Sequence, residues 1–130
     1  MTRVVLDTNV LVSALWTPAG NASMVASLVL TGKVTLCFDT HILEEYRAVL
    51  HRPRLAFPSG QVESLLHALT NRGFSVMVPP STIALPDEAD RKFYDVARYC
   101  RAYLVTGNIR HYPKEANIMT PALFLEMHAN

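Results

Sequence analysis

Short apolar runs that alternate with amphipathic stretches constrain this chain more than any other feature of its sequence. Runs of strand length, most of them rich in β-branched residues, occur at residues 3–6, 34–38, 74–78, 103–106 and 117–120. Between most of them lie longer segments whose apolar residues are three and four positions apart, which is the spacing of one helix face. Strands that alternate with helices favour a parallel sheet, because parallel neighbours must be joined by long crossover connections.

Five segments carry the boundary signals of helices as well as their apolar spacing. Ser, Thr and Asp are favoured just before a helix because their side chains accept hydrogen bonds from its first amides, whereas Gly and Pro end helices. A parallel sheet covered by helices on both faces follows, and such sheets carry their sites at the carboxyl ends of the strands. The predicted helices cover residues 21–30, Asp39 or Thr40 to about Leu50, a capping Ser59 to a stop at Gly73, Asp87 or Glu88 to about Tyr99, and Pro121 onward.

The length and composition predict one ordinary folded domain over residues 1–130. Half of the 130 residues are hydrophobic and 18% are charged, which is typical of globular proteins and not of disordered ones. No apolar run approaches the length that crosses a membrane, and no signal-peptide pattern precedes the first strand. Cys37 and Cys100 stand far apart within apolar stretches, so we expect free thiols and a cytoplasmic location.

The net charge gives no general attraction for nucleic acid. Twelve Lys and Arg against eleven Asp and Glu leave a formal charge of +1, so any contact with nucleic acid must be local. Basic residues gather around residues 47–54 and again around residues 91–114. The ordinary interpretation of both groups is a solvated helix face.

Four polar segments are expected at the carboxyl edge of the sheet. They are residues 7–9 after the first strand, residues 44–45 in the helix after the second strand, residues 87–90 at the start of a later helix, and residues 106–108 after the fourth strand. Because the carboxyl ends of parallel strands share one edge, we expect these segments to converge.

Asp7 and Glu45 differ in how readily an ordinary structural role explains them. Asp7 stands where a residue that caps the next helical turn would stand, and Asp often has that role. Glu45 shares a helix face with Ile42 and Val49, so its carboxylate is directed toward packed surface, where an unpaired charge is costly. Glu44, one step around the helix, is expected to face solvent.

Asp87 and Asp90 are three residues apart at a predicted helix start. Interaction of negative charge with a helix N-terminus explains Asp87 without any metal. Asp90 differs because Phe93 and Ala97 continue its face, which directs a second carboxylate toward packed surface. Asp95 is expected to be a solvated charge.

Several carboxylates in one cleft predict a bound cation. Like charges in close contact resist joint ionisation, and a divalent ion relieves that conflict. Oxygen ligands without Cys or paired His suit Mg²⁺ or Mn²⁺ rather than Zn²⁺, and Mg²⁺ commonly bridges to phosphate. A phosphodiester is then the natural substrate, with one or two ions activating water for in-line attack.

Four motifs in order resemble the PIN-domain proteins, and most closely those of the VapC-like kind, the toxin components of toxin–antitoxin systems. The resemblance extends from the first strand to Thr120-Pro121, and four motifs in order are fairly specific where one would be weak. The motifs are Leu6–Leu15, Leu43–Leu50, Asp87–Phe93 with Ala97, and Leu104–Asn108.

The resemblance implies an α/β/α three-layer sandwich with a central parallel sheet of about four to five strands. It also implies an endoribonuclease that depends on Mg²⁺ or Mn²⁺, a homodimer, and inhibition by a partner antitoxin. Carried over by position, Asp7, Glu45 and Asp90 are the catalytic and metal-binding acids.

The resemblance also assigns supporting roles around these acids. Many family members carry an acidic residue where this chain has Asn108, which adds no charge and places a second ion in doubt. Asp87, one turn before Asp90, is expected to compensate as a metal ligand. The supporting residues are Thr8, Asn9, Asp87, Thr106 and Asn108, and the candidates for binding RNA are Arg47, Arg91, Lys92 and Arg110.

Other interpretations of the same residues remain open. A phosphatase of the haloacid-dehalogenase type needs a second Asp at the place of Asn9, and a phosphoacceptor receiver domain needs paired acids after its first strand. The stronger rival is a PIN-like module without turnover that binds RNA or protein, because Asn108 and the near-neutral charge weaken the case for catalysis. The five His residues show no ligand spacing and are expected at the surface or in caps.

Overall fold

The fold is built on a sheet of five parallel strands. The computed structural model describes residues 1–129, and the strand order is β3-β2-β1-β4-β5. The sheet is therefore wound outward from β1 in both directions, which requires the crossover connections predicted from the sequence. The strands are β1 (Arg3–Leu6), β2 (Thr35–Phe38), β3 (Phe74–Ser75), β4 (Tyr103–Val105) and β5 (Ile118–Met119).

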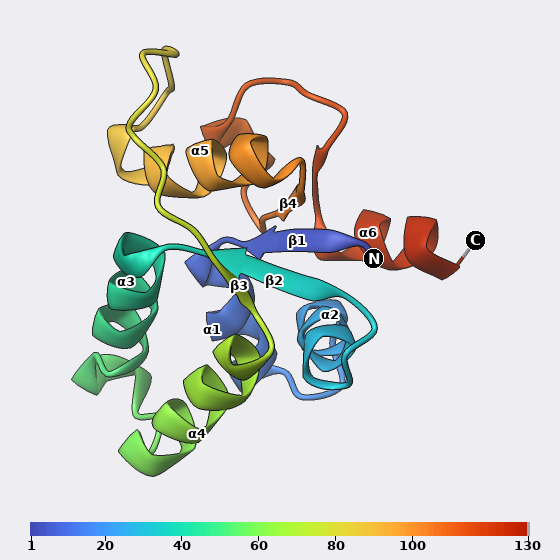
Figure 1. Ribbon diagram of the computed structural model, residues 1–130. Coiled ribbons are helices and arrows are strands. Elements are labelled where there is room, and N and C mark those ends of the chain that lie inside the picture. The colour runs from blue at the N-terminus through green and yellow to red at the C-terminus, as the bar shows by residue number, and fades with distance from the viewer. Residues whose placement is uncertain (130) are drawn as a thin grey trace.

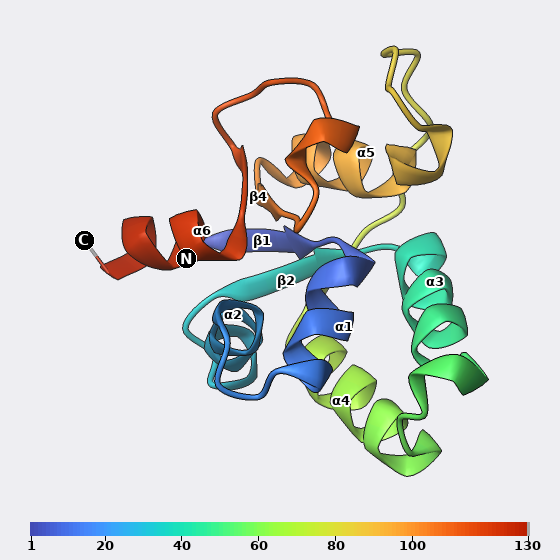
Figure 2. The same ribbon diagram turned by 180° about the vertical axis from the view of Figure 1, so that it is seen from behind.

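Helices cover both faces of this sheet. In Figure 1, α5 lies above β1 and β2, while α1, α2, α3 and α4 lie below them, and Figure 2 shows the same division from behind. The predicted α/β/α sandwich with about four to five parallel strands is confirmed. The helices are α1 (Thr8–Trp16), α2 (Asn21–Leu30), α3 (Thr40–Leu50), α4 (Ser59–Asn71), α5 (Arg91–Cys100) and α6 (Pro121–Ala129), with short 3₁₀ turns η1 (Pro53–Leu55), η2 (Glu88–Asp90) and η3 (Ile109–His111).

The core explains why the central strand is wholly apolar. Val4, Val5 and Leu6 are all inaccessible to solvent, because helices press on both faces of β1. Tyr46 of α3 and Phe93 of α5 are equally buried, so the predicted inward stripes of both helices contribute to one continuous core.

Several predicted boundaries are wrong. Residues 8–16 form α1, a helix that was not predicted. The predicted strand 74–78 pairs with β2 only at Phe74 and Ser75, after which the chain leaves the sheet ahead of Pro79 and Pro80, which have no amide hydrogen to donate to a neighbouring strand.

Two expected helix starts also differ. Ser59 is the first residue of α4 rather than its cap, a position that Pro58 takes. The helix expected from Asp87 is divided into η2 and α5 at Asp90. Among the described residues, 1–129, no helix is long and apolar enough to cross a membrane.

Candidate functional site

Asp7 lies at the carboxyl end of β1 and is 6% exposed. Its backbone precedes α1, but its side chain makes no capping hydrogen bond. Instead, Thr106 Oγ1 and Tyr112 Oη donate hydrogen bonds of 2.9 and 2.8 Å to Asp7 Oδ2. Burial raises the pKa of Asp7 and the negative charge of Glu45 raises it further, while the two hydroxyl donors act in the opposite direction. The carboxylate therefore does not cap α1. It is held in place by two residues that follow β4, the strand beside β1.

Glu45 projects from α3 toward the same edge. Its side chain is 28% exposed, so it is half-buried rather than directed fully into packed surface. Thr8 Oγ1 donates a hydrogen bond to Glu45 Oε2, and Lys92 Nζ lies 2.8 Å from Oε1. The carboxylate thus links the start of α1 to α5, and Glu44 beside it is exposed as expected.

Asp90 contributes a third carboxylate at the junction of η2 and α5. Its side chain is 12% exposed, and its Oδ2 atom is buried with no hydrogen-bond partner. His111 Nδ1 lies 3.2 Å from that atom, but not in the alignment of a hydrogen bond. Burial, followed by the negative charge of Asp7, raises the pKa of Asp90 to about 6. An unsatisfied buried carboxylate oxygen is costly, and a cation is one way to satisfy it.

The hydroxyl of Tyr112 contacts Asp7, and the negative charges of all three acids act on it. Burial raises the pKa of Tyr112, and the charges of Asp7, Asp90 and Glu45 each raise it further. Asp7 therefore lies close enough to Glu45 and to Asp90 for their charges to interact, whereas the acids whose ligand atoms lie within 4.8 Å of one another are Asp87 and Asp90, together with His111.

Asp87 caps η2 and also lies beside Asp90 and His111. Its Oδ1 accepts a hydrogen bond of 2.9 Å from the Ala89 amide, so the capping interpretation of Asp87 is correct. One carboxylate oxygen from each of Asp87 and Asp90, with one ring nitrogen of His111, lie within 4.8 Å of one another. These three residues could share an ion with the acids beside them.

Asn9 and Asn108 organise the loops around the acids. Asn9 Oδ1 accepts a hydrogen bond of 2.9 Å from the Gly107 amide. The Asn108 amide donates to Thr106 Oγ1 over 3.0 Å, and its side-chain nitrogen lies 2.9 Å from His111 Nε2. Asn108 therefore holds Thr106, which donates to Asp7, and His111, which lies beside Asp90.

The basic residues proposed from the sequence occupy different environments. Arg47 is exposed and pairs with Glu63 over 3.2 Å. Arg91 pairs with Glu88, and its guanidinium also donates to the carbonyl oxygens of residues 81 and 83. Lys92 contacts Glu45 in the acidic cluster, and Arg110 is exposed on η3.

One expectation about a polar residue is wrong, and two contacts at the site were missed. Asp95 is 7% exposed rather than solvated, because it accepts hydrogen bonds from Ser81 N at 2.9 Å and Ser81 Oγ at 2.6 Å. His111 is exposed, as expected, but its position beside Asp90 was not predicted. Tyr112 had no sequence signal, since it lies in an irregular segment without periodicity.

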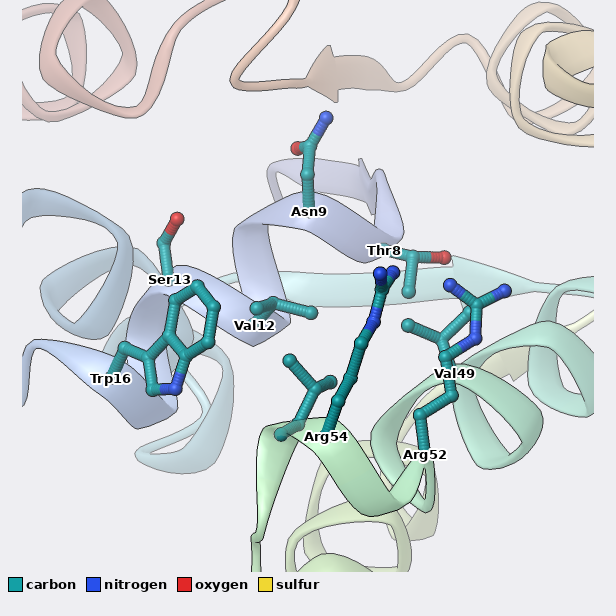
Figure 3. A pocket seen from close by; sticks show the side chains of 9 residues that line it. Thr8, Asn9, Val12, Ser13, Trp16, Val49, Arg52 and Arg54 are labelled. Carbon is teal, nitrogen blue, oxygen red and sulfur yellow. The ribbon is translucent and has the colours of Figure 1, made fainter.

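A groove opens beside the acidic cluster. It encloses about 610 Å³ and is lined on one side by α1 and on the other by the end of α3 and by η1. Figure 3 shows Thr8 and Asn9 at the start of α1, Trp16 at its far end, and Arg52 and Arg54 on the opposite side of the groove. Thr8 belongs to both features, because it lines the groove and donates to Glu45.

The chain is similar to known proteins in sequence and in fold. A family model described as "PIN domain" matches residues 3–110. The uncharacterized protein MJ1680 of Methanocaldococcus jannaschii is 33% identical over 109 residues, which span 82% of this chain and 70% of that protein. A chain in the crystal structure of VapBC2 from Rickettsia felis, bound to a DNA fragment from their promoter, superposes with a TM-score of 0.58 at 17% identity, over 92% of this chain and 97% of its own length.

Proposed function

The chain belongs to the PIN-domain family, and from this premise we propose that it is a metal-dependent endoribonuclease that hydrolyses RNA phosphodiester bonds. The observation that carries the proposal is a set of contacts at the carboxyl edge of the sheet: Tyr112 donates to Asp7, Thr8 beside Asp7 donates to Glu45, and His111 beside Tyr112 contacts Asp90. The mutual repulsion of these acids and the unsatisfied Oδ2 of Asp90 are conditions that a bound cation would relieve.

The donor set suits Mg²⁺ or Mn²⁺. Asp7, Glu45 and Asp90 would hold the ion, and Asp87 would assist because its carboxylate lies beside that of Asp90. These are oxygen donors, which hard cations prefer, and the single imidazole of His111 is compatible with Mn²⁺. When bound, the ion would activate water for in-line attack on the phosphodiester and stabilise charge on the departing oxygen.

The surrounding residues of the chain would keep the acids in their working positions. Thr106 and Tyr112 orient the Asp7 carboxylate through two hydrogen bonds, and Thr8 orients that of Glu45. Asn9 and Asn108 fix the loop that carries Thr106. Partners of this kind restrict the rotation of ligating carboxylates, which supports affinity and activity.

We assign the phosphate contacts at the acidic cluster to Lys92 and Arg110. Lys92 lies within the cluster, and Arg110 is exposed on η3 next to His111. Arg47 and Arg91 are weaker candidates, since their guanidinium groups are engaged by Glu63 and by Glu88 with backbone carbonyls. Cations that hold the backbone position a substrate without reading its sequence.

The finer role that we propose is that of the toxin in a toxin–antitoxin pair. The fold match to a chain of the Rickettsia felis VapBC2 structure and the motif resemblance support this role. A cognate antitoxin protein and a homodimer are the partners it implies, and the cytoplasm is where a ribonuclease with free Cys37 and Cys100 would act.

Cleavage of a mixed RNA pool by the purified chain tests the proposal. Structured and single-stranded RNA would be incubated with Mg²⁺, Mn²⁺ or EDTA, with a single-stranded DNA pool beside them. We expect cutting that requires metal and is lost in both Asp7→Asn and Asp90→Asn. Glu44→Gln is the matched control, because Glu44 is an exposed carboxylate next to Glu45, and this variant should cut normally. Cutting that persists in EDTA or in Asp7→Asn would contradict the assignment.

A second candidate is a PIN-like module that binds RNA or protein without cutting. It is favoured by Asn108, which adds no charge, and by Lys92, whose ammonium already neutralises Glu45. Titrations with Mn²⁺ and with RNA separate the two functions. The enzyme requires Mn²⁺ binding that Asp7→Asn abolishes. The module would bind RNA equally well as wild type and as Asp7→Asn.

A further inference from the structure

The groove beside the acidic cluster carries an exposed aromatic ring that is held in place. Trp16, the last residue of α1, is 62% exposed. Its indole packs edge-on against Phe57 with ring centroids 6.2 Å apart. A large aromatic surface that is open to solvent but fixed from behind is suited to stacking with a flat ligand.

Two arginines face this ring across the groove. Arg52 and Arg54 flank Pro53 and are both exposed. Figure 3 shows both guanidinium groups extending from η1 and the end of α3 toward Thr8. Within residues 1–129, neither side chain makes an ion pair or a hydrogen bond, and no carboxylate lines the groove. Two neighbouring positive charges without a counter-ion attract a phosphate.

The groove is continuous with the acidic cluster. Thr8 and Asn9 line its inner end, and Thr8 also donates to Glu45. A chain of nucleotides that places one phosphodiester at the acids could therefore place the next nucleotide in the groove. The volume of about 610 Å³ lies within the range of about 300–1,000 Å³ of small-molecule sites.

We infer that this groove binds one nucleotide next to the cleaved bond of single-stranded RNA, with its base against Trp16 and its phosphate between Arg52 and Arg54. The inference rests on the proposed function for the position of the cleaved bond. Val12 and Val49 supply an apolar wall for the base. A flat apolar ring and a phosphate together are the chemistry of a nucleotide, and stacking accepts any base.

The fluorescence of Trp16 tests the inference without catalysis, because it is the only tryptophan in the chain. Wild-type protein in EDTA, where metal-dependent cutting cannot occur, is titrated with a short single-stranded RNA. We expect saturable quenching of the tryptophan emission. An oligomer of the same length without bases should bind through its phosphates but leave the emission unchanged. Absence of quenching by the complete RNA at saturation overturns the inference.

Substitutions separate the two halves of the groove, with binding followed by the anisotropy of labelled RNA. Trp16→Ala should weaken binding about tenfold, which corresponds to about 1.4 kcal/mol, and Trp16→Phe should restore most of it. The double variant Arg52→Ala/Arg54→Ala should lower the slope of log affinity against log salt by about 0.7, since each phosphate neutralised on a single strand contributes about 0.7.

Lys33→Ala is the control for loss of positive charge away from the groove, because Lys33 is exposed just before β2, at the opposite edge of the sheet. It should leave both the quenching and the salt slope unchanged. An equal change of slope in Lys33→Ala and the arginine variant would mean general electrostatics and would overturn the inference.

The outcomes keep the inference apart from the proposed function. Quenching by RNA in a protein that never cuts RNA would support nucleotide binding in the groove and contradict the nuclease proposal. Metal-dependent cutting that is unaffected by Trp16→Ala and by the arginine variant would support the nuclease proposal and contradict nucleotide binding in the groove. A partner polypeptide that quenches Trp16, where RNA does not, would assign the groove to a protein and overturn the inference.

Discussion

Asp90 gives the acidic cluster a pH dependence whose sign follows from its surroundings. Burial and the charge of Asp7 raise its pKa from 3.8 to about 6 in the folded chain. The folded state therefore binds more protons than the unfolded state between about pH 4 and pH 6, so stability without metal falls as pH rises through that window.

Asp90→Asn should accordingly stabilise the metal-free fold near neutral pH. The upper limit is about 3 kcal/mol, since each pKa unit corresponds to about 1.4 kcal/mol, and the gain should vanish below about pH 4, where both forms are neutral. Thermal unfolding in EDTA across this range measures the effect. Glu44→Gln, the exposed control, should show no such trend, and a metal-free Asp90→Asn protein less stable at neutral pH would contradict the account.

On the proposed function, Tyr112 is a positioning residue that acts through Asp7 and does not contact the substrate. Its hydroxyl donates to Asp7 Oδ2 over 2.8 Å, and the residue is 5% exposed. Tyr112→Phe should cost about 1 kcal/mol of stability and lower metal affinity or activity about 10- to 100-fold. Calorimetric titration with Mn²⁺ and cleavage rates measure the two effects. Tyr99→Phe removes a hydroxyl from an exposed tyrosine and should change neither quantity; equal losses in both variants would refute a positioning role.

The acids were predictable at the residue scale, but their partners were not. Asp7 ends a strand, while Glu45 and Asp90 follow helical spacing against apolar residues, so periodicity located them. Tyr112 and His111 lie in the irregular segment between β4 and β5, where no period exists. Asp95 was misjudged because its partner, Ser81, belongs to a loop fourteen residues away, and a helical pattern contains no information about such a contact.

The segment between β3 and α5 is held by side chains of α5. Asp95 accepts two hydrogen bonds from Ser81, and Arg91 donates to the backbone oxygens of Ser81 and Ile83. Asp95→Ala should destabilise the fold by about 1–3 kcal/mol, because it leaves the Ser81 amide and hydroxyl without an acceptor in a half-buried position.

Hydrogen exchange measures that effect locally. The Ser81 amide should exchange faster in Asp95→Ala, while amides of β1 keep protection relative to global stability. Glu126→Ala removes an exposed carboxylate from α6 and should leave Ser81 unaffected. Unchanged exchange at Ser81 in Asp95→Ala would contradict the role of this contact.

Elements with clear periods were predicted well, and those without them were not. The helices α2 and α3 have the predicted bounds, and Asp39 caps α3 as its sequence indicated. The helix α1 escaped prediction because Val10, Leu11 and Val12 form a continuous apolar run, which fits a buried helix and a buried strand equally. The strand β3 is short because its pairing with β2 stops ahead of Pro79. β-propensity alone overstates the length of this strand, because pairing depends on the neighbouring strand.

Metal binding should be visible in the stability of the whole molecule. If the acids hold Mn²⁺, saturation at about a hundredfold excess over the dissociation constant should add about 2.7 kcal/mol to the free energy of unfolding. Thermal unfolding with increasing Mn²⁺ measures this gain, which should be absent in Asp7→Asn and retained in Glu44→Gln. Equal stabilisation of wild type and Asp7→Asn would place the ion elsewhere.

Glu45 stands where the two helical layers come within reach of each other around the end of the sheet. It belongs to α3, accepts from Thr8 at the start of α1, and pairs with Lys92 of α5, which covers the opposite face. Lys92 thus neutralises Glu45, and their ion pair connects the two helical layers. A substitution at Glu45 consequently changes the mechanical coupling of the layers together with the charge of the cluster. Loss of activity in a Glu45 variant could therefore come from the lost contact between the layers or from the lost charge. The partners of Asp7, Thr106 and Tyr112, both follow β4. Loss of activity in an Asp7 variant is therefore due to the acidic cluster itself.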